Sequence, residues 1–153
     1  MISMKATFAA GCFWHVEDLF RKVKGVSSAT SGYTGGAMPN PSYQDVCTDR
    51  TGHAEAVQVE YDPEQVSYDE LLKVFWENHN PTTLNRQGPD VGTQYRSAIF
   101  FHDAEQEKAA KESMKNLQES MPEKKVVTEI TPTKEFFKAE EYHQRYFEKQ
   151  GLI

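Results

Sequence analysis

Segments with the two-residue period of strands alternate with segments of helical period along the whole chain, and this alternation limits the folds open to it. The strand patterns cover residues 5–10, 26–33, 54–61, 95–101 and 126–131, and the helical patterns cover residues 13–23, 67–78, 103–120 and 133–149. Several connections are too short for the crossover of about a dozen residues that joins parallel strands, so some neighbouring strands must be antiparallel. We therefore expect an α+β fold, a two-layer α/β sandwich with a mixed sheet.

Length and charge narrow the class of protein further. The chain has 153 residues, the length of one domain, and we expect a single domain over residues 1–153. Its 17 Lys and Arg against 23 Asp and Glu leave a net charge of −6, which argues against a dedicated nucleic-acid binder. No stretch approaches the roughly 20 apolar residues of a membrane span, and the first ten residues do not form a secretion signal. These features predict a soluble, cytoplasmic protein.

The chain contains two cysteines, Cys12 and Cys47. Two are too few for a disulfide scaffold at this length. A structural zinc site is disfavoured, because its ligands would have to come from scattered residues such as His15 and His53. In a reducing compartment, each cysteine is then either a small buried apolar residue or a reactive thiol.

Cys12 stands where the first strand pattern ends and the first helical pattern begins. Gly11 before it permits a sharp turn of the backbone. The unpaired N–H groups of the first helical turn carry a partial positive charge that would stabilise a thiolate and lower the pKa of Cys12. The position alone leaves two interpretations open, a reactive cysteine and a buried structural cysteine at a turn.

Two large rings, Phe13 and Trp14, follow this cysteine directly. Neighbouring side chains on a helix diverge by about 100°, so we expect one of the two rings to line a pocket wall. An apolar wall beside a nucleophile suits a small apolar group such as a methyl. The alternative is that both rings belong to the core.

Glu55 lies in the strand pattern over residues 54–61, on the same face as Val57 and Val59. That face is apolar, so we expect it to point to the core. Burial of a carboxyl raises its pKa, and a carboxyl that stays protonated near neutral pH has the property of a general acid. The alternative is a glutamate on an edge strand that faces water.

Several other polar side chains are candidates for a site or for packing. Glu17 lies one helical turn after Trp14 and is either solvated or paired with a Lys or Arg. A phenol at a pocket rim can donate a hydrogen bond to an oxygen atom, and an aspartate can accept a hydrogen bond from a phenol or order a water. The groups in or beside the glycine-rich loops are Tyr33, Tyr43, Asp90 and Tyr95.

Six motifs in this order resemble the peptide methionine sulfoxide reductase A family. They are Gly11-Cys12-Phe13-Trp14 with Glu17, Gly32-Tyr33-Thr34-Gly35-Gly36, Asn40-Pro41-Ser42-Tyr43, Thr51-Gly52-His53-Ala54-Glu55-Ala56-Val57, Phe75-Trp76-Glu77-Asn78-His79 and Gly92-Thr93-Gln94-Tyr95-Arg96-Ser97. The similarity runs from about Lys5 to about Phe147. It implies a mixed α/β sandwich that reduces the S epimer of methionine sulfoxide, free or in proteins, and so repairs oxidised proteins under oxidative stress.

The resemblance also implies a role for each matching residue. Cys12 would be the nucleophile, Phe13 and Trp14 would hold the methyl group of the substrate, Glu55 would protonate the sulfoxide oxygen, Tyr43 and Tyr95 would bind that oxygen, and Asp90 would help to order the site. Oxygen transfer to Cys12 leaves a sulfenic acid, which a second thiol converts to a disulfide. No metal and no organic cofactor is expected.

The sequence departs from the family pattern at its C-terminal end, where many members carry further cysteines and this chain has none. We expect a monomer with a one-cysteine cycle, in which an external thiol (thioredoxin, or glutathione with glutaredoxin) attacks the sulfenic acid on Cys12. The alternative is that Cys47 resolves Cys12 after a loop movement.

Two further readings of the site stay open at this point. A thiol peroxidase would need an activating Arg or Thr near Cys12 and would tolerate the loss of Glu55. A module that binds methyl groups or methionine side chains without catalysis would need only the aromatic pair.

Overall fold

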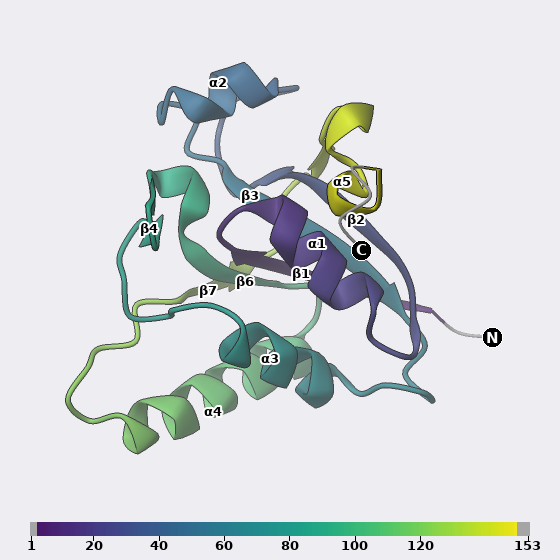
Figure 1. The fold of residues 1–153 in the computed structure, drawn as a ribbon. Coiled ribbons are helices and arrows are strands. Elements are labelled where there is room, and N and C mark those ends of the chain that lie inside the picture. Colours follow the sequence, from purple (N-terminus) through teal and green to yellow (C-terminus); the bar gives the residue numbers. More distant parts are fainter. Residues whose placement is uncertain (1–2, 150–153) are drawn as a thin grey trace.

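The computed structural model describes residues 3–149, built around a six-stranded sheet (Figure 1). Its strands are β1 (Met4–Ala10), β2 (Val26–Thr34), β3 (Ala54–Tyr61), β6 (Ser97–Phe101), β7 (Glu129–Pro132) and β8 (Phe137–Lys138). They lie in the order β7-β6-β1-β3-β2-β8, and every pair is antiparallel except β6 with β7. The sheet is therefore mixed, which confirms the predicted fold class.

The longer helices begin at the residues that the sequence indicates. They are α1 (Phe13–Arg21), α3 (Tyr68–Glu77) and α4 (Ala104–Ser120). The side chain of Ser67 accepts a hydrogen bond from the backbone N–H of Glu70, and Asp103 does the same for Gln106. Each bond pairs an N–H group that a helix start leaves without a partner, so these residues fix where α3 and α4 begin.

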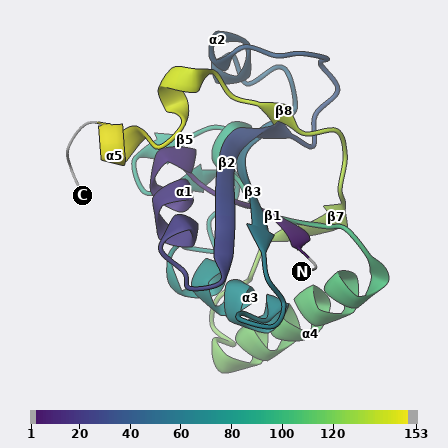
Figure 2. The same ribbon diagram turned by 90° about the vertical axis from the view of Figure 1, so that its right-hand side faces the viewer.

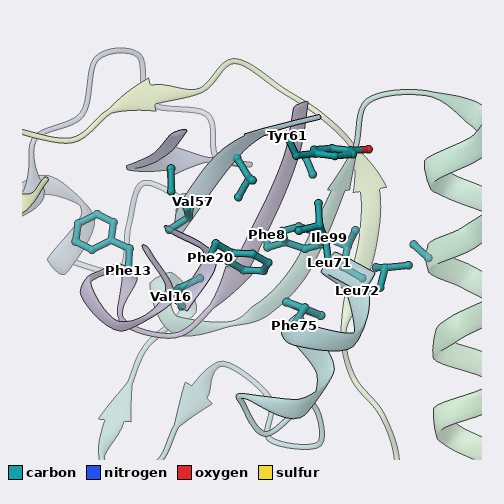
Figure 3. Packing of buried hydrophobic residues seen from close by; sticks show 14 of the residues in the cluster. Phe8, Phe13, Val16, Phe20, Val57, Tyr61, Leu71, Leu72, Phe75 and Ile99 are labelled. Atoms are coloured by element: carbon teal, nitrogen blue, oxygen red, sulfur yellow. The ribbon is translucent and has the colours of Figure 1, made fainter. Parts of the chain in front are cut away.

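The main apolar core lies between one face of the sheet and these helices (Figure 3). Phe8 from β1 stacks on Phe20 of α1 with ring centroids 4.9 Å apart, and it also contacts Phe75 of α3 at 5.3 Å. The opposite face of the sheet carries four buried alanines and the ring of Phe100, with Phe136 packed against them. The sheet and its helices thus form the two expected layers.

The C-terminal region differs from the prediction of one helix over residues 133–149. It forms β8, a single turn of 3₁₀ helix η2 (Glu141–His143) and the short helix α5 (Tyr146–Lys149). The backbone N–H of Ala139 donates to the carbonyl of Ser31 on β2 at 2.9 Å, and Arg145 adopts a positive φ of 51°. Pairing with β2 thus overrides the helical spacing of the aromatic residues.

Two shorter features were also missed by the sequence patterns. Helix α2 (Tyr43–Cys47) follows the loop after β2 and begins with a capping box between Ser42 and Asp45. The polar segment expected over residues 82–94 contains the hairpin β4 (Arg86–Gln87) and β5 (Asp90–Val91), followed by the 3₁₀ helix η1 (Thr93–Tyr95). Elements of two to five residues carry too little periodicity to be seen in a sequence.

Two views of the ribbon place α2 and the C-terminal region together at one end of the molecule, with α3 and α4 at the other end (Figures 1 and 2). Among the described residues, no helix has both the length and the apolar character that crossing a membrane requires.

Candidate active site

The pairing of three strands brings the first candidate residues together. β1 runs antiparallel to β3, with Phe8 opposite Val57, so the end of β1 lies beside the start of β3 and Glu55. On the other side of β3, Tyr33 of β2 lies directly opposite Glu55. The chain leaves β1 through Gly11, and Cys12 then precedes the first residue of α1.

Gly11 is required by its backbone and by its surroundings. Its φ is +100°, a conformation that favours glycine, and a Cβ at this position would lie 3.0 Å from Cγ of Gln87. This turn sets Cys12 at the head of α1, where the sequence placed it.

Glu55 is buried, with 1% of its surface exposed. Its Oε1 accepts a hydrogen bond from the backbone N–H of Phe13 at 3.3 Å, and its Oε2 has no hydrogen-bond partner among the described residues. Burial raises the pKa of Glu55 to about 8, against the effect of the Phe13 N–H and with a smaller contribution from Asp90. The prediction that Glu55 faces inward and has a raised pKa is confirmed.

Cys12 differs from the prediction in the direction of its pKa. The backbone N–H groups of Trp14 and His15 lower the pKa, as expected for a helix start, but burial outweighs them and raises it to about 11. Negative charge on Glu55 and Asp90 raises it further. In the free site, Cys12 is a protonated thiol, because the helix terminus offsets only part of the cost of burying a charge.

Tyr43, Tyr95 and Asp90 lie within electrostatic range of Glu55. Burial raises the pKa of Tyr95 to about 12, and charges on Glu55, Cys47, Asp90 and Cys12 add to this effect. The pKa of Tyr43 is also raised, first by burial and then by Glu55. Both phenols are therefore neutral donors. Tyr95 and Asp90 interact electrostatically with Cys12 and Glu55, and Tyr43 interacts with Glu55.

The two rings after Cys12 have different surroundings, as the helical spacing predicts. Phe13 is buried, with its ring centroid 5.6 Å from that of Tyr33 and 6.3 Å from that of Tyr43. Trp14 is half-buried and stacks on Tyr146 of α5, with centroids 3.7 Å apart. Trp14 also donates its Nε1–H to Nδ1 of His143 at 2.8 Å. Phe13 joins the core, whereas Trp14 is the ring at the edge of the site.

The C-terminal segment over residues 139–149 completes this site, and the sequence patterns gave no sign of it. The buried side chain of Gln144 accepts from the backbone N–H of Ser31 and donates to its carbonyl, both at 2.9 Å. Glu140 accepts from the phenol of Tyr33 at 2.8 Å and from the backbone N–H of Tyr43 at 3.0 Å. These partners lie about a hundred positions apart in the chain, so no local signal marks them.

Glu17 also holds this segment, which settles the alternatives left open for it. Its buried carboxylate accepts a hydrogen bond from the backbone N–H of Arg145 and forms an ion pair with Arg21 at 3.0 Å. Glu17 is therefore paired with a cation, as one of the alternatives had it, but it lies inside the protein and fixes the segment to α1.

Cys47, at the end of α2, is exposed, whereas Cys12 is half-buried, and both are free thiols. Burial raises the pKa of Cys47, while a hydrogen bond with the Tyr43 side chain lowers it. Charges on Glu55 and Glu140 also raise this pKa, so α2 holds Cys47 within electrostatic range of the site. In the range 3–149, no cluster of three or more His, Cys, Asp or Glu side chains is arranged to hold a metal ion.

One site contains all of these groups: a thiol at a helix start, a protonated carboxyl with one oxygen that has no partner among the described residues, two neutral phenols and an apolar wall. Such a site can deliver a proton to an oxygen atom while a sulfur nucleophile attacks the atom that carries it. These features define a class of thiol-dependent enzymes that act on a polar, oxygen-bearing group.

Comparison with known proteins identifies the family within this class. The model of the peptide methionine sulfoxide reductase family matches residues 4–152. The chain is 61% identical over 146 residues to peptide methionine sulfoxide reductase MsrA of Methanothermobacter thermautotrophicus, covering 95% of this chain and 86% of that protein. The chain belongs to the peptide methionine sulfoxide reductase family.

Solved structures agree with this assignment. Methionine sulfoxide reductase A of Corynebacterium diphtheriae superposes with a TM-score of 0.91 at 38% identity, over 99% of this chain and 76% of that chain. The reduced form of Mxr1 from Saccharomyces cerevisiae also gives 0.91 at 38% identity, over 99% of this chain and 87% of that chain. The structure of Mxr1 in complex with Trx2 superposes with a TM-score of 0.67 at 28% identity, over 94% of this chain and 84% of that chain.

Proposed function

We propose that this protein reduces the S epimer of methionine sulfoxide, free and in proteins, with Cys12 as the nucleophile and Glu55 as the acid. The observation that carries the assignment of roles is the geometry of Glu55. One carboxyl oxygen is bound to the backbone beside Cys12, and the other is buried without a partner among residues 3–149. A protonated carboxyl with a free oxygen can donate a hydrogen bond to the oxygen of a bound sulfoxide.

The arrangement of the other side chains supports a specific orientation of the substrate. The phenols of Tyr43 and Tyr95 are neutral donors near Glu55, so they bind the sulfoxide oxygen on the same side. The ring of Trp14, next to Cys12, faces the methyl group. Asp90 orders this side of the site through its charge. The site is chiral, because the groups that bind the oxygen, the ring that faces the methyl group and the attacking sulfur have fixed positions. Only one epimer therefore fits. The family resemblance implies that it is the S epimer.

The reaction follows from the two protons that the site holds. Glu55 transfers its proton to the sulfoxide oxygen, which makes the sulfoxide sulfur electrophilic. The sulfur of Cys12 attacks, and its own proton returns to the Glu55 carboxylate. The S–O bond to the substrate breaks and the oxygen passes to Cys12, so methionine leaves and a Cys12 sulfenic acid remains. The substrate sulfur is reduced, the Cys12 sulfur is oxidised, and Glu55 ends in its starting state.

An external thiol then restores Cys12. Its attack on the sulfenic acid releases water and forms a mixed disulfide, and a second thiol reduces that disulfide. The name of the yeast complex pairs Mxr1 with Trx2, which supports thioredoxin as the reductant here. Glutathione with glutaredoxin is the other candidate reductant. With either reductant, we propose a monomeric, cytoplasmic enzyme. We infer that Cys47 is not required for this cycle, because the external thiol attacks the Cys12 sulfenic acid directly.

The test is turnover of the two separated sulfoxide epimers by wild type, Cys12→Ser and Cys47→Ser. Each variant is assayed with dithiothreitol, with thioredoxin, and with glutathione plus glutaredoxin. We expect wild type to reduce the S epimer alone, Cys12→Ser to lose at least ~10⁴-fold in rate, and Cys47→Ser to stay within about twofold. A peroxide assay in parallel tests the peroxidase alternative.

Mass spectrometry under non-reducing conditions after one turnover separates the two recycling schemes. An adduct of the external thiol on Cys12 supports the one-cysteine cycle, whereas a Cys12–Cys47 disulfide supports resolution by Cys47. Activity that survives in Cys12→Ser, or equal reduction of both epimers, contradicts the mechanism.

A further inference from the structure

Glu140 lies in the C-terminal segment, and its two carboxylate oxygens reach two other parts of the chain. Oε1 accepts the phenol proton of Tyr33 on β2 at 2.8 Å. Oε2 accepts the backbone N–H of Tyr43, the first residue of α2, at 3.0 Å. One side chain therefore connects the sheet, the C-terminal segment and the helix that carries a proposed oxygen-binding phenol.

Helix α2 needs such a connection to keep its orientation. It has five residues, and a helix of this length is not stable by itself. The capping box of Ser42 and Asp45 stabilises its first turn but stays within the helix, and Val46 is its buried side chain. The hydrogen bond from Tyr43 to Glu140 ties the start of α2 to a residue 97 positions away.

The position of Glu140 is itself well determined. The preceding residue, Ala139, is buried and donates its backbone N–H to the carbonyl of Ser31 at 2.9 Å. Tyr33, the other partner of Glu140, is fully buried and lies opposite Glu55 in the strand pairing. Glu140 thus fixes the start of α2 relative to β2, the strand that pairs with the strand of Glu55.

The charge of Glu140 suits this role. Burial alone would raise its pKa, but the N–H of Tyr43, its own backbone and the phenol of Tyr33 outweigh burial, and its pKa is lowered. Glu140 is therefore an ionised acceptor for both donors, whereas Glu55 keeps its proton.

We propose that Glu140 is a positioning residue for sulfoxide reduction: by holding the start of α2 against β2, it sets the Tyr43 phenol beside Glu55. This proposal rests on the function proposed above. The phenol can stabilise charge on the departing oxygen only from a fixed position, because preorganised donors act without reorganisation during the reaction. Loss of Glu140 should therefore slow the transfer of oxygen more than it weakens substrate binding.

The experiment is a double-mutant cycle in single-turnover kinetics, with enzyme in excess and methionine S-sulfoxide as substrate. This format measures methionine formation before any external thiol acts. Glu140→Gln keeps the size of the side chain but places a donor where an acceptor is needed. We expect it to lower the maximal rate constant about tenfold and to change the half-saturating concentration less than about threefold.

The Tyr43→Phe background shows whether the loss of rate in Glu140→Gln depends on Tyr43. In a Tyr43→Phe background, Glu140→Gln should change the rate constant less than about twofold, because the phenol it positions is gone. The matched control is Glu141→Gln, which removes the next, exposed carboxylate and its ion pairs with Lys138 and Lys149. We expect this control to stay within about twofold of wild type.

The outcomes separate this proposal from the proposed function. If wild type does not reduce the S-sulfoxide, the proposed function fails and this proposal fails with it. If wild type is active and Glu140→Gln stays within twofold of it, or loses tenfold equally in the Tyr43→Phe background, only the positioning role is wrong. Should Glu140→Gln fail to fold, as shown by thermal unfolding, Glu140→Asp is judged by the same criteria. Its shorter carboxylate keeps the charge but reaches one donor at most.

Discussion

The two halves of the candidate site are built in different ways. Cys12 and Glu55 are placed by regular strand pairing and by the start of a helix, close together and held by backbone geometry. The residues of the C-terminal segment are held by single side-chain hydrogen bonds to strands and helices that are far away in the sequence. In the sheet half, the backbone of paired strands and of a helix start therefore fixes the positions of Cys12 and Glu55. In the proposed mechanism, the segment half would set how the substrate and the phenols lie against these two residues.

Glu55→Gln tests the sheet half and should give the largest effect of the three changes that follow. Glutamine keeps the acceptor for the Phe13 N–H but has no acidic proton, so we expect kcat/KM for the S-sulfoxide to fall by ~100- to 10,000-fold. In wild type, kcat/KM should fall above pH 8 or so, because burial raises the pKa of Glu55 to about 8 and the acid is lost above it. A variant that keeps wild-type activity, or a wild-type profile that rises through this range, would mean that Glu55 is not the acid.

The same variant makes a second prediction, on stability. The pKa of Glu55 rises from 4.5 to about 8 on folding, so the folded state keeps a proton that the unfolded state loses. Wild type is then penalised by up to about 1.4 kcal/mol for each pH unit between these values, whereas Glu55→Gln is not. We expect the two free energies of unfolding to agree near pH 4 and the variant to become the more stable as the pH rises toward 8. Chemical denaturation across this range measures it, and parallel curves would contradict the buried protonated acid.

Gln144→Ala tests the segment half and should give a smaller change in activity. Its loss leaves the buried N–H and carbonyl of Ser31 without their side-chain partner, so we expect the free energy of unfolding to fall by about 3 kcal/mol. Because His143 and Tyr146 contact Trp14 from this segment, KM should rise several-fold with little change in kcat.

The matched control is Gln65→Ala, an exposed glutamine whose amide donates to Asp62. It should stay within about 0.5 kcal/mol of wild type. Equal loss of kcat and kcat/KM in Gln144→Ala, with KM unchanged, would show that Gln144 acts on the chemical step, as proposed for Glu140, and not on the contacts of Trp14 with substrate.

The sheet half is also the part that the sequence could predict. Alternation along β3 is enough to put Glu55 on the face of Val57 and Val59, and Gly11 followed by an amphipathic segment is enough to put Cys12 at a helix start. Local patterns suffice there because the spacing of a strand or a helix fixes where each side chain points. The start of α3 at Ser67 was predictable for the same reason.

The segment half could not be predicted, because its contacts join distant positions. The bond of Gln144 to Ser31 spans 113 residues and that of Glu140 to Tyr33 spans 107, and neither leaves a periodic signal. The aromatic residues there have helical spacing, so the pattern predicts a helix that pairing with β2 prevents. The direction of the Cys12 pKa was missed for a related reason. The helix start is local, but the burial that outweighs it depends on what the whole fold packs around the thiol.

The high pKa of Cys12 has a consequence for an enzyme that works where oxidants are present. Hydrogen peroxide reacts with the anionic form of sulfur, and a thiol that keeps its hydrogen is a poor target for it. The raised pKa of Cys12 therefore predicts that the resting thiol reacts slowly with peroxide. In the proposed mechanism, the Cys12 sulfur becomes reactive once a bound sulfoxide has taken the proton of Glu55, so the oxidised side chain itself would trigger its repair.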